Sequence, residues 1–362
     1  MFQSILIGIL PCKEEFWPII KEKASEEEDV SIRWRSFAEI EDEGTATLVV
    51  SAVSDADPNS VIKLLHRELA SAFPEENIET EMWATAPAPI DLKPKDGYQL
   101  CKDKDEKEWQ DWTSHTLKEF GIIVQEGILS QKQVHEIRSL VDQAIDEVEN
   151  LLRTHRPEIE IGKDSFLFKE IASRNLQRFD LRLDSIASDF VTKCVMENPT
   201  VKGILTRSLG NYDDIDFDVS AVYSKPGACV QGWHADGDHQ KGGKFAGWSN
   251  DGWKNELSDP FAICLFIPLI DLNESVGFTQ FWPKSHWTKD LAGFGPIAVL
   301  TNTTFDAMGK AGDAIFYDYR LMHRGMPNTS ELMRPVLQVV VKKKWYVEEA
   351  NYGEESIVTS KE

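Results

Sequence analysis

The sequence predicts an α+β protein with a double-stranded β-helix (jelly-roll) core, flanking helices and a small N-terminal ferredoxin-like βαββαβ domain. Two observations predict this class. From Asp216 onward, several short apolar strands follow a helical lead-in and are separated by loops rich in Gly, Pro and Asp, which is typical of an antiparallel double-sheet barrel. Residues 1–84 instead alternate strands and helices in the βαββαβ order. A chain of 362 residues has room for one large and one small domain.

Residues 1–84 are expected to form the small domain. Pro58 occupies a position that proline favours in the first turn of a helix, and Val61, Leu65 and Leu69 follow it at helical spacing. The other expected elements are strands at Phe2–Leu10, Val30–Phe37, Thr45–Ala52 and Ile78–Trp83 and a helix at Lys13–Lys23. This fold serves many functions, so a small-molecule regulatory role and a packing or dimerisation role both stay open.

Residues 85–105 are rich in Pro, Lys and Asp, which is typical of a linker. The large domain, residues 106–346, is expected to start with a helix at Lys107–Phe120 and a second, longer helix that Ser130 caps. The buried stripe of the longer helix is expected to contain Val134, Ile137, Leu140, Val141, Ile145, Val148, Leu151 and Leu152. Residues 347–362 form an acidic tail that is expected to be frayed.

The jelly roll is expected to hold one small ligand at its mouth. The insert Asp238–Pro260 contains Trp248 and Trp253, and it is either a lid over that ligand or a loop that its tryptophans hold in place. The strands are expected at Asp218–Tyr223, Val230–Asp236, Phe261–Pro268, Thr279–Trp282, Ala298–Asn302, Asp313–Tyr317 and Val336–Val341.

Composition narrows the classes of function. The formal net charge of −22 argues against binding to nucleic-acid phosphates or to an anionic membrane surface. Five scattered cysteines without a CxxC pair argue against a disulfide framework or a zinc–cysteine site. The apolar run Phe261–Ile270 is too short to span a membrane, and Met1–Cys12 lacks the basic flank of a signal peptide. These features predict a cytoplasmic protein that acts on a small molecule.

Three residues have the chemistry and spacing of an iron site. His234 and Asp236 lie two apart in Gly232-Trp-His-Ala-Asp-Gly237, so on a strand they point to the same face. His323 ends another apolar strand. Two imidazoles and one carboxylate make the facial triad that holds Fe(II) and leaves positions open for a cosubstrate and oxygen. Arg334 follows His323 by eleven residues, which is far enough to return beside the metal and clamp a carboxylate.

Four segments occur in a specific order: Gly121–Ser130, Trp233–Asp236, Gly277–His286, and Gly312–Gly325 followed by Arg334-Pro335. Together they resemble the phytanoyl-CoA dioxygenase (PhyH) family of Fe(II)/2-oxoglutarate oxygenases. A single HxD motif is common, whereas the four ordered segments are specific. The resemblance covers about residues 106–346 and leaves residues 1–84 outside. One departure is Lys284, which stands where the family's Pro-Gly-Ser-His turn has glycine.

The resemblance implies an enzyme that uses Fe(II), 2-oxoglutarate and O2, with ascorbate in a supporting role. It assigns the catalytic metal site to His234, Asp236 and His323, and cosubstrate binding to Arg334 and, as weaker candidates, Thr279 and Tyr223. Asp238 and His239 are expected to start a loop, and His286 to close a turn, rather than to bind metal.

The implied reaction is hydroxylation of an unactivated C–H bond of a small molecule, with succinate and CO2 as coproducts. Desaturation or oxidative ring closure, as in the kainoid-forming oxygenases, uses the same cofactors and stays open. A non-catalytic sensor that binds metal and 2-oxoglutarate is a competing interpretation, and the intact ligand set argues against it. A cupin-like metalloenzyme without 2-oxoglutarate is a third, and Arg334 argues against that. Neither a nucleic acid nor a membrane is an expected partner.

The substrate-binding residues are less well defined. Arg174, Arg178 and Arg182 lie close together in an acidic chain. They are either salt-bridged surface arginines, which is the simpler interpretation, or a pocket wall that meets an anionic substrate. Aromatic candidates for the pocket are Trp233, Trp248 and Trp282, although aromatic residues in strands more often belong to a core.

Overall fold

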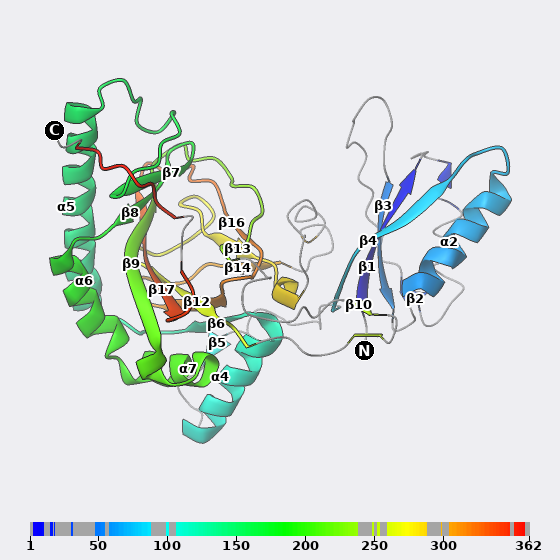
Figure 1. Ribbon diagram of the computed structural model, residues 1–362, viewed down its shortest axis with the longest axis horizontal. Helices are drawn as coiled ribbons and strands as arrows, with labels where there is room; N and C mark the ends of the chain where they lie inside the picture. The colour runs from blue at the N-terminus through cyan, green and yellow to red at the C-terminus, as the bar shows by residue number, and fades with distance from the viewer. Residues whose placement is uncertain are drawn as a thin grey trace. The chain divides into compact units, whose positions relative to one another are not determined.

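The computed structural model describes most of the large domain and parts of the N-terminal region (Figure 1). The described residues are 3–10, 15–16, 18, 30–31, 48–54, 58–87, 99–100, 106–237, 248–249, 252–253, 259–287, 298, 304–347 and 351–358. The chain divides into two compact units. The first contains residues 1–92, 243–258 and 282–304, and the second contains residues 93–242, 259–281 and 305–362.

The first unit contains a four-stranded antiparallel sheet in the order β2-β3-β1-β4. Its elements are β1 (Gln3–Leu10), β2 (Val30–Ser31), β3 (Leu48–Ser54), α2 (Pro58–Ala72) and β4 (Glu79–Pro87), with the short pair β10 (Trp248–Ser249) and β11 (Gly252–Trp253) and a 3-10 turn, η3 (Ser285–Trp287). Helix α2 starts at Pro58 and buries Val61, Leu65 and Leu69 along one stripe, as the helical spacing predicts. Most of the helix expected at Lys13–Lys23 lies outside the described residues.

Three of the helices described in the second unit begin with a side-chain N-cap, provided by Ser130, Asp184 and Asn198. The described helices are α4 (Glu106–Phe120), α5 (Gln131–His155), α6 (Ser185–Val191) and α7 (Pro199–Leu209), with a π-helical turn η1 (Thr192–Met196) and a 3-10 turn η2 (Tyr212–Asp214). Ser130 caps α5 as predicted: its hydroxyl accepts from the Gln133 N–H, while the Gln133 side chain accepts from the Ser130 N–H at 2.9 Å. This reciprocal pair satisfies two backbone donors at the start of the helix.

The buried stripe of α5 is narrower than the sequence predicts. Six of the eight expected residues are buried, but Leu140 is only half-buried and Leu151 is 37% exposed. Each of the two directly precedes a buried residue of the stripe, and one residue turns the helix by about 100°. The prediction was therefore wrong for Leu151, which faces away from the core.

The second unit is built on an eight-stranded sheet in the order β5-β6-β15-β12-β17-β9-β8-β7, antiparallel except for the β5–β6 pair. A three-stranded antiparallel sheet has the order β14-β13-β16. The strands are β5 (Gln99–Leu100), β6 (Ile122–Gln125), β7 (Ile171–Asn175), β8 (Arg178–Arg182), β9 (Ile215–Ser224), β12 (Ala262–Pro268), β13 (Thr279–Phe281), β14 (Phe305–Ala307), β15 (Ala314–Asp318), β16 (His323–Gly325) and β17 (Arg334–Lys343). The unit thus combines helices with antiparallel sheet.

The two faces of the large sheet have different chemistry because side chains alternate along each strand. Along β17, Leu337, Val339 and Val341 pack into the core that also holds the buried stripe of α5. The intervening positions include Arg334 and Gln338, which line a cavity on the other face. Figure 1 shows α5 and α6 running beside β8 and β9. The helices therefore cover one face of the sheet and leave the other for polar chemistry.

Two of the expected strands are not strands among the described residues. Val230–Asp236 is not a strand: within it the structure has only a single antiparallel bridge, between His234 and His323. The HxD motif therefore lies on a loop, which contacts β16 through the His234–His323 bridge and through the Gln231 N–H, which donates to the Gly325 carbonyl at 2.9 Å. Of the strand expected at Ala298–Asn302, only Ala298 is described, and it is helical.

The C-terminal segment 351–358 is not frayed, contrary to the expectation for an acidic tail. Ile357 is 1% exposed, and the Lys169 N–H donates to the Glu355 carbonyl at 2.8 Å. The Gly353 N–H donates to the Phe168 carbonyl. These contacts return the tail to the loop before β7, and no feature of its composition indicates them. No helix in the described part of the chain has the length and apolar character needed to cross a membrane.

Candidate active site

His234, Asp236 and His323 meet at one place in the second unit. The backbones of His234 and His323 form the single bridge, with N–H to O distances of 3.0 and 2.8 Å in the two directions. His323 also pairs with Phe281 as the first residue of β16. One ligand atom from each of the three side chains lies within 4.8 Å of the others. This spacing allows one metal ion to contact all three residues.

The two imidazoles are oriented in the same way. His234 Nδ1 lies 2.8 Å from the Gly232 carbonyl oxygen, and His323 Nδ1 lies 2.9 Å from the Leu321 carbonyl oxygen. A carbonyl oxygen only accepts, so each Nδ1 carries the proton and each Nε2 keeps its lone pair. The Nε2 atoms of His234 and His323 lie 3.9 and 3.6 Å from Asp236 Oδ1. Three donor atoms therefore face a common point.

A hydrogen bond fixes the carboxylate of Asp236. The Tyr317 hydroxyl donates to Asp236 Oδ2 at 2.8 Å, which leaves Oδ1 facing the imidazoles. Tyr317 itself is fully buried on β15. Outer partners of this kind hold metal ligands in position.

The protonation states suit a metal ligand set. Burial of His323 lowers the pKa of its imidazole to about 4, against an opposing effect from Asp236, so the ring is neutral at neutral pH. The side chain of His323 is 5% exposed and that of His234 is 39% exposed, so the site is open on one side. Two imidazoles and one carboxylate with an open face are the donor set of non-heme Fe(II).

A cavity of about 140 Å³ adjoins these ligands and contains two buried arginines. Arg334, at the start of β17, is 3% exposed, and its Nη1 donates to the Phe278 carbonyl at 3.2 Å. Arg178, at the start of β8, is 1% exposed and donates to the Met326 carbonyl at 2.9 Å. Neither forms an ion pair with a described carboxylate, and within the described chain the Nε of each has no acceptor.

The burial of two cations without acids is costly and points to an anion. Burial lowers the pKa of Arg178 to about 10. Burial and, secondarily, the nearby charge of Arg178 lower the pKa of Arg334 well below its ordinary value. Because the free N–H groups of both residues belong to one cavity, an entering carboxylate would find several donors there.

The structure brings one of the two weaker cosubstrate candidates to this cavity. Thr279 lines it and is 8% exposed. Tyr223 does not: its hydroxyl donates to Glu149 Oε1 at 3.2 Å, and its ring stacks on Phe179 at 5.0 Å, on the helix-covered face. Val222, its neighbour on β9, lines the cavity instead. Because side chains alternate along a strand, a shift of one residue changes the face.

The substrate candidates are distributed over several places. Arg182 lines a second cavity of the same unit. Trp233 is buried, with the Arg324 guanidinium 4.9 Å from its ring centroid, and it does not line either cavity. Trp248 and Trp282 belong to the first unit, so their role at the pocket stays a prediction.

The structure describes only some of the other residues that lie near the motifs. Asp238 and His239 lie outside the described residues. His286 is 1% exposed in the turn Ser285–Trp287. Lys284 has a φ of 70°, so this position keeps the left-handed backbone that a glycine would adopt without strain.

Sequence reasoning missed several wall and support residues, among them Tyr317, Asp180 and Asn351. Tyr317 holds Asp236, and Asp180 and Asn351 line the cavity. Tyr317 follows Gly312-Asp313 on an apolar strand, where an aromatic residue is ordinary. Asn351 lies in the tail, and no local pattern places a tail residue beside a site built from distant strands.

Three of the solved structures that resemble the chain are enzymes or ligand complexes of non-heme metal proteins. The non-heme alpha-ketoglutarate-dependent epimerase SnoN from nogalamycin biosynthesis is 15% identical, with a TM-score of 0.46 over 66% of this chain and 82% of that one. The carbocyclase SnoK from the same biosynthesis is 18% identical, with a TM-score of 0.41 over 67% and 85%. HygX from Streptomyces hygroscopicus, solved with nickel, 2-oxoglutarate and hygromycin B, is 12% identical, with a TM-score of 0.44 over 67% and 93%.

The sequence itself matches a family. Residues 117–336, more than half of the chain, match phytanoyl-CoA dioxygenase (PhyH). The match spans the HxD segment, the distal histidine and the arginine that follows it, so the resemblance noted from the motifs is confirmed. The chain belongs to the phytanoyl-CoA dioxygenase (PhyH) family and is an Fe(II)- and 2-oxoglutarate-dependent dioxygenase.

Proposed function

We propose that the enzyme hydroxylates an unactivated C–H bond of a small molecule and that His234, Asp236 and His323 hold its Fe(II). This proposal depends mainly on one observation. Two imidazole Nε2 atoms and Asp236 Oδ1 face one point, beside a cavity with two buried arginines that have no acidic partner among the described residues. When bound, the iron with 2-oxoglutarate activates O2 and supplies the oxidising power, and succinate and CO2 leave as coproducts.

The protein's part in this reaction is to hold three ligands in the correct state. The Gly232 and Leu321 carbonyls keep the protons on Nδ1 of His234 and His323. Tyr317 keeps Asp236 from rotating. The ligands therefore need little reorganisation when the metal binds, which lowers the entropic cost of forming the site.

We assign Arg334 to the far carboxylate of 2-oxoglutarate and add Arg178 as a second donor to that carboxylate. Both are buried in the cavity beside the ligands and lack an acidic partner among the described residues. This revises the expectation that Arg178 meets the substrate. Thr279 lines the same cavity and offers a hydroxyl to the cosubstrate. Val222 and Val336 supply apolar wall area, which reduces the access of water to the reacting groups.

Hydroxylation is the simplest outcome of this chemistry, and desaturation or ring closure is the alternative. The choice depends on how the substrate lies against the metal, and no contact of the described residues favours the alternatives. The proposed partner is a small molecule. HygX and SnoN were crystallised with hygromycin B and nogalamycin RO, respectively, and we extend to this chain only the small-molecule class.

We also propose the finer features of the architecture. The large and the three-stranded sheets of the second unit fit a jelly roll closed around the metal. The order β2-β3-β1-β4 with antiparallel neighbours fits a ferredoxin-like domain. The proposed domains are residues 1–84 and 106–346, joined by the linker 85–105, with 347–362 as a tail that packs on the large domain over residues 351–358.

The proposal is tested by anaerobic titration of the full-length protein with Fe(II) and 2-oxoglutarate, recorded by visible absorption. Chelation of iron by the keto acid is expected to give a weak charge-transfer band. Asp236→Ala is expected to abolish the band, whereas Asp146→Asn, an exposed position of α5, is expected to keep it. An equal band in Asp236→Ala and in the wild type would contradict the ligand assignment. Succinate release in air, measured across a panel of small molecules, then tests whether the substrate is a small molecule.

A further inference from the structure

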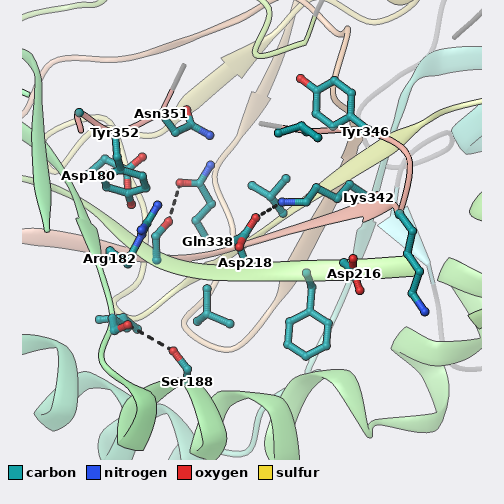
Figure 2. Close-up of a pocket in the computed structure, with 18 residues that line it drawn as sticks. Asp180, Arg182, Ser188, Asp216, Asp218, Gln338, Lys342, Tyr346, Asn351 and Tyr352 are labelled. Carbon is teal, nitrogen blue, oxygen red and sulfur yellow. Dashed lines mark hydrogen bonds and ion pairs between the residues drawn. The ribbon is translucent and has the colours of Figure 1, made fainter. Parts of the chain in front are cut away.

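A second cavity, of about 570 Å³, adjoins the one that carries the arginines (Figure 2). Asp180, Gln338 and Asn351 line both. Its size lies within the range of about 300–1,000 Å³ that small-molecule sites occupy. We propose that this cavity binds the body of the substrate, and that the substrate is a compact polar molecule bearing a carboxylate rather than a fatty acyl thioester. This inference rests on the function proposed above.

The two cavities follow the same strand end to end. Along β17, Arg334, Val336 and Gln338 line the first cavity, and Gln338, Val340 and Lys342 line the second. Alternate residues of a strand point to one face, so these β17 residues lie on the face opposite the helices, and the two cavities meet there at Gln338. The second cavity also extends to the helix-covered side, where Val219 and Ser188 of α6 line it. A molecule in the second cavity would therefore present one end toward the metal ligands.

The wall of the second cavity is strongly charged. Its acidic and basic side chains are Asp180, Asp216, Asp218, Arg182, Lys342 and Lys344. A long acyl chain would strip water from these groups without replacing their hydrogen bonds, which is costly. Two of the cations are already engaged: Lys342 pairs with Asp218, as Figure 2 shows, and Lys344 Nζ donates to the Asp213 carbonyl at 2.7 Å. A polar substrate fits this wall.

Arg182 is the cation that is left for a substrate. It forms no ion pair with a carboxylate of the described residues, and its guanidinium lies 4.4 Å from the ring centroid of Tyr352. Stacking on an aromatic face fixes the plane of the guanidinium while its N–H groups stay free at the edge. That edge matches a carboxylate through two parallel hydrogen bonds. We therefore assign Arg182 to the carboxylate of the substrate.

The C-terminal tail builds this subsite. The Tyr352 hydroxyl donates to Asp180 Oδ1 at 2.6 Å, and Arg174 Nη2 donates to Asp180 Oδ2 at 3.2 Å. Asn351 Nδ2 donates to the Tyr319 hydroxyl at 3.0 Å. Figure 2 shows Arg182, Asp180 and Tyr352 grouped at one end of the cavity. The tail thus sets the plane on which the exposed Arg182 guanidinium rests.

The test uses the full chain loaded with Mn(II) in place of iron and saturated with 2-oxoglutarate. The probes are hexanoate, 1-hexanol and hexanoyl-CoA, and the readout is the paramagnetic relaxation of their protons by the metal as each is titrated. Hexanoate is expected to bind beside the metal more tightly than the other two. Arg182→Gln is expected to weaken hexanoate about tenfold, which is the effect of losing one charge-assisted contact. Arg207→Gln, at an exposed position of α7, is expected to leave hexanoate binding unchanged.

A second variant keeps the test independent of the charge change. Tyr352→Leu removes the ring beneath the guanidinium and is expected to weaken the binding of hexanoate. Mn(II) should still relax the protons of 2-oxoglutarate in this variant. The inference is overturned if hexanoyl-CoA binds as tightly as hexanoate, or if Arg182→Gln binds hexanoate like the wild type. It is also overturned if Mn(II) relaxes the protons of 2-oxoglutarate but not those of hexanoate. If the metal fails to relax 2-oxoglutarate in the wild type, the proposed function itself has failed.

Discussion

The hydroxyl of Tyr317 donates a 2.8 Å hydrogen bond to Asp236 Oδ2. This bond connects β15 of the large sheet with the HxD loop, which also hydrogen-bonds to β16 at His323 and Gly325. Burial, with the nearby charge of Asp236, raises the pKa of Tyr317 well above its ordinary value, so the phenol stays a donor. The sheet therefore sets the direction of a carboxylate that sits in an irregular segment.

Tyr317→Phe is expected to weaken metal binding about 10- to 100-fold, as the loss of an outer partner does at other metal sites. The carboxylate would keep its charge but lose the contact that aims Oδ1 at the imidazoles. Titration of the apoprotein with Mn(II), followed by electron paramagnetic resonance, measures the effect. Tyr212→Phe removes a hydroxyl that donates to the Met196 carbonyl at 2.9 Å, away from the metal ligands, and should bind metal normally. Equal affinity in Tyr317→Phe and Tyr212→Phe would contradict this role.

Arg334→Met is expected to remove the stabilisation that 2-oxoglutarate gives and to raise the stability of the apoprotein by about 1–2 kcal/mol. Arg334 is a buried cation without a described acidic partner, and an apolar side chain of similar length avoids its desolvation cost. In the wild type, ligand at about 100 times its Kd stabilises by about 2.7 kcal/mol, and this gain should vanish. Urea unfolding with and without 2-oxoglutarate gives both numbers.

Arg320→Met is the matched control because its buried arginine is paired. Arg320 donates from Nε and Nη2 to Asp318 at 2.8 and 2.6 Å. Its removal leaves a buried carboxylate without that partner, so a loss of about 3–5 kcal/mol is expected. If the two variants change stability in the same direction, the unpaired state of Arg334 is not the cause.

The sequence indicated the proposed metal ligands more clearly than the walls of the site, for a physical reason. Ligands carry chemistry that stands out at fixed spacing, so His234, Asp236 and His323 could be proposed together. The helix cap at Ser130 was equally visible, because a cap depends on neighbouring residues. Tyr223 was misplaced because periodicity does not say which face of a strand is covered by helices.

Long-range contacts account for what the sequence left out. Asp180 and Tyr352 meet through a hydrogen bond across 172 residues. Neither has a local pattern that marks it, since an aspartate between arginines and a tyrosine in an acidic tail are both ordinary on a surface. The strand β8 was missed for the same reason: its residues Arg178–Arg182 alternate polar and apolar as on a surface strand, yet Arg178 and Asp180 are buried beside a cavity, and only Arg182 is exposed.

Gly277→Ala is expected to destabilise the protein more than Gly227→Ala, although both glycines have nearly the same left-handed φ, 85° and 84°. Each substitution pays about 1–2 kcal/mol for that backbone conformation. A Cβ at Gly277 would also lie 2.4 Å from the Pro327 carbonyl oxygen and 2.9 Å from Arg334 Nη1, whereas one at Gly227 meets nothing within 4 Å. The difference between the variants therefore isolates the contact.

The same pair should separate in cosubstrate binding. Displacement of the Arg334 guanidinium by the new methyl group is expected to weaken 2-oxoglutarate about tenfold in Gly277→Ala and not in Gly227→Ala, as measured by titration of the charge-transfer band. If the two variants lose the same stability and the same affinity, Gly277 is needed only for its left-handed backbone conformation and not for the space beside Arg334.

Asp180→Asn is expected to gain stability relative to the wild type as pH rises above about 4. Burial raises the pKa of the Asp180 carboxyl above its ordinary value of 3.8, although Arg174 and the Tyr352 hydroxyl oppose the shift. A carboxyl with a raised folded-state pKa stabilises the fold most below the unfolded value, and that contribution is lost as pH rises through the folded value. The neutral amide of Asp180→Asn cannot lose a proton, so the stability of this variant lacks that pH dependence.

The measurement is urea unfolding of both proteins at several values of pH from 4 to 8, with the difference in unfolding free energy plotted against pH. With rising pH, the unfolding free energy of Asp180→Asn should increase relative to that of the wild type. The difference should then become constant once the carboxyl of the wild type is ionised. Hydrogen exchange of residues 351–358 adds a local readout, because the amide keeps a partner for the Tyr352 hydroxyl but loses the charge that holds Arg174. If the wild type instead becomes more stable than Asp180→Asn as pH rises, the interactions with Arg174 and Tyr352 outweigh the effect of burial. Asp180 would then be held as a carboxylate by the tail.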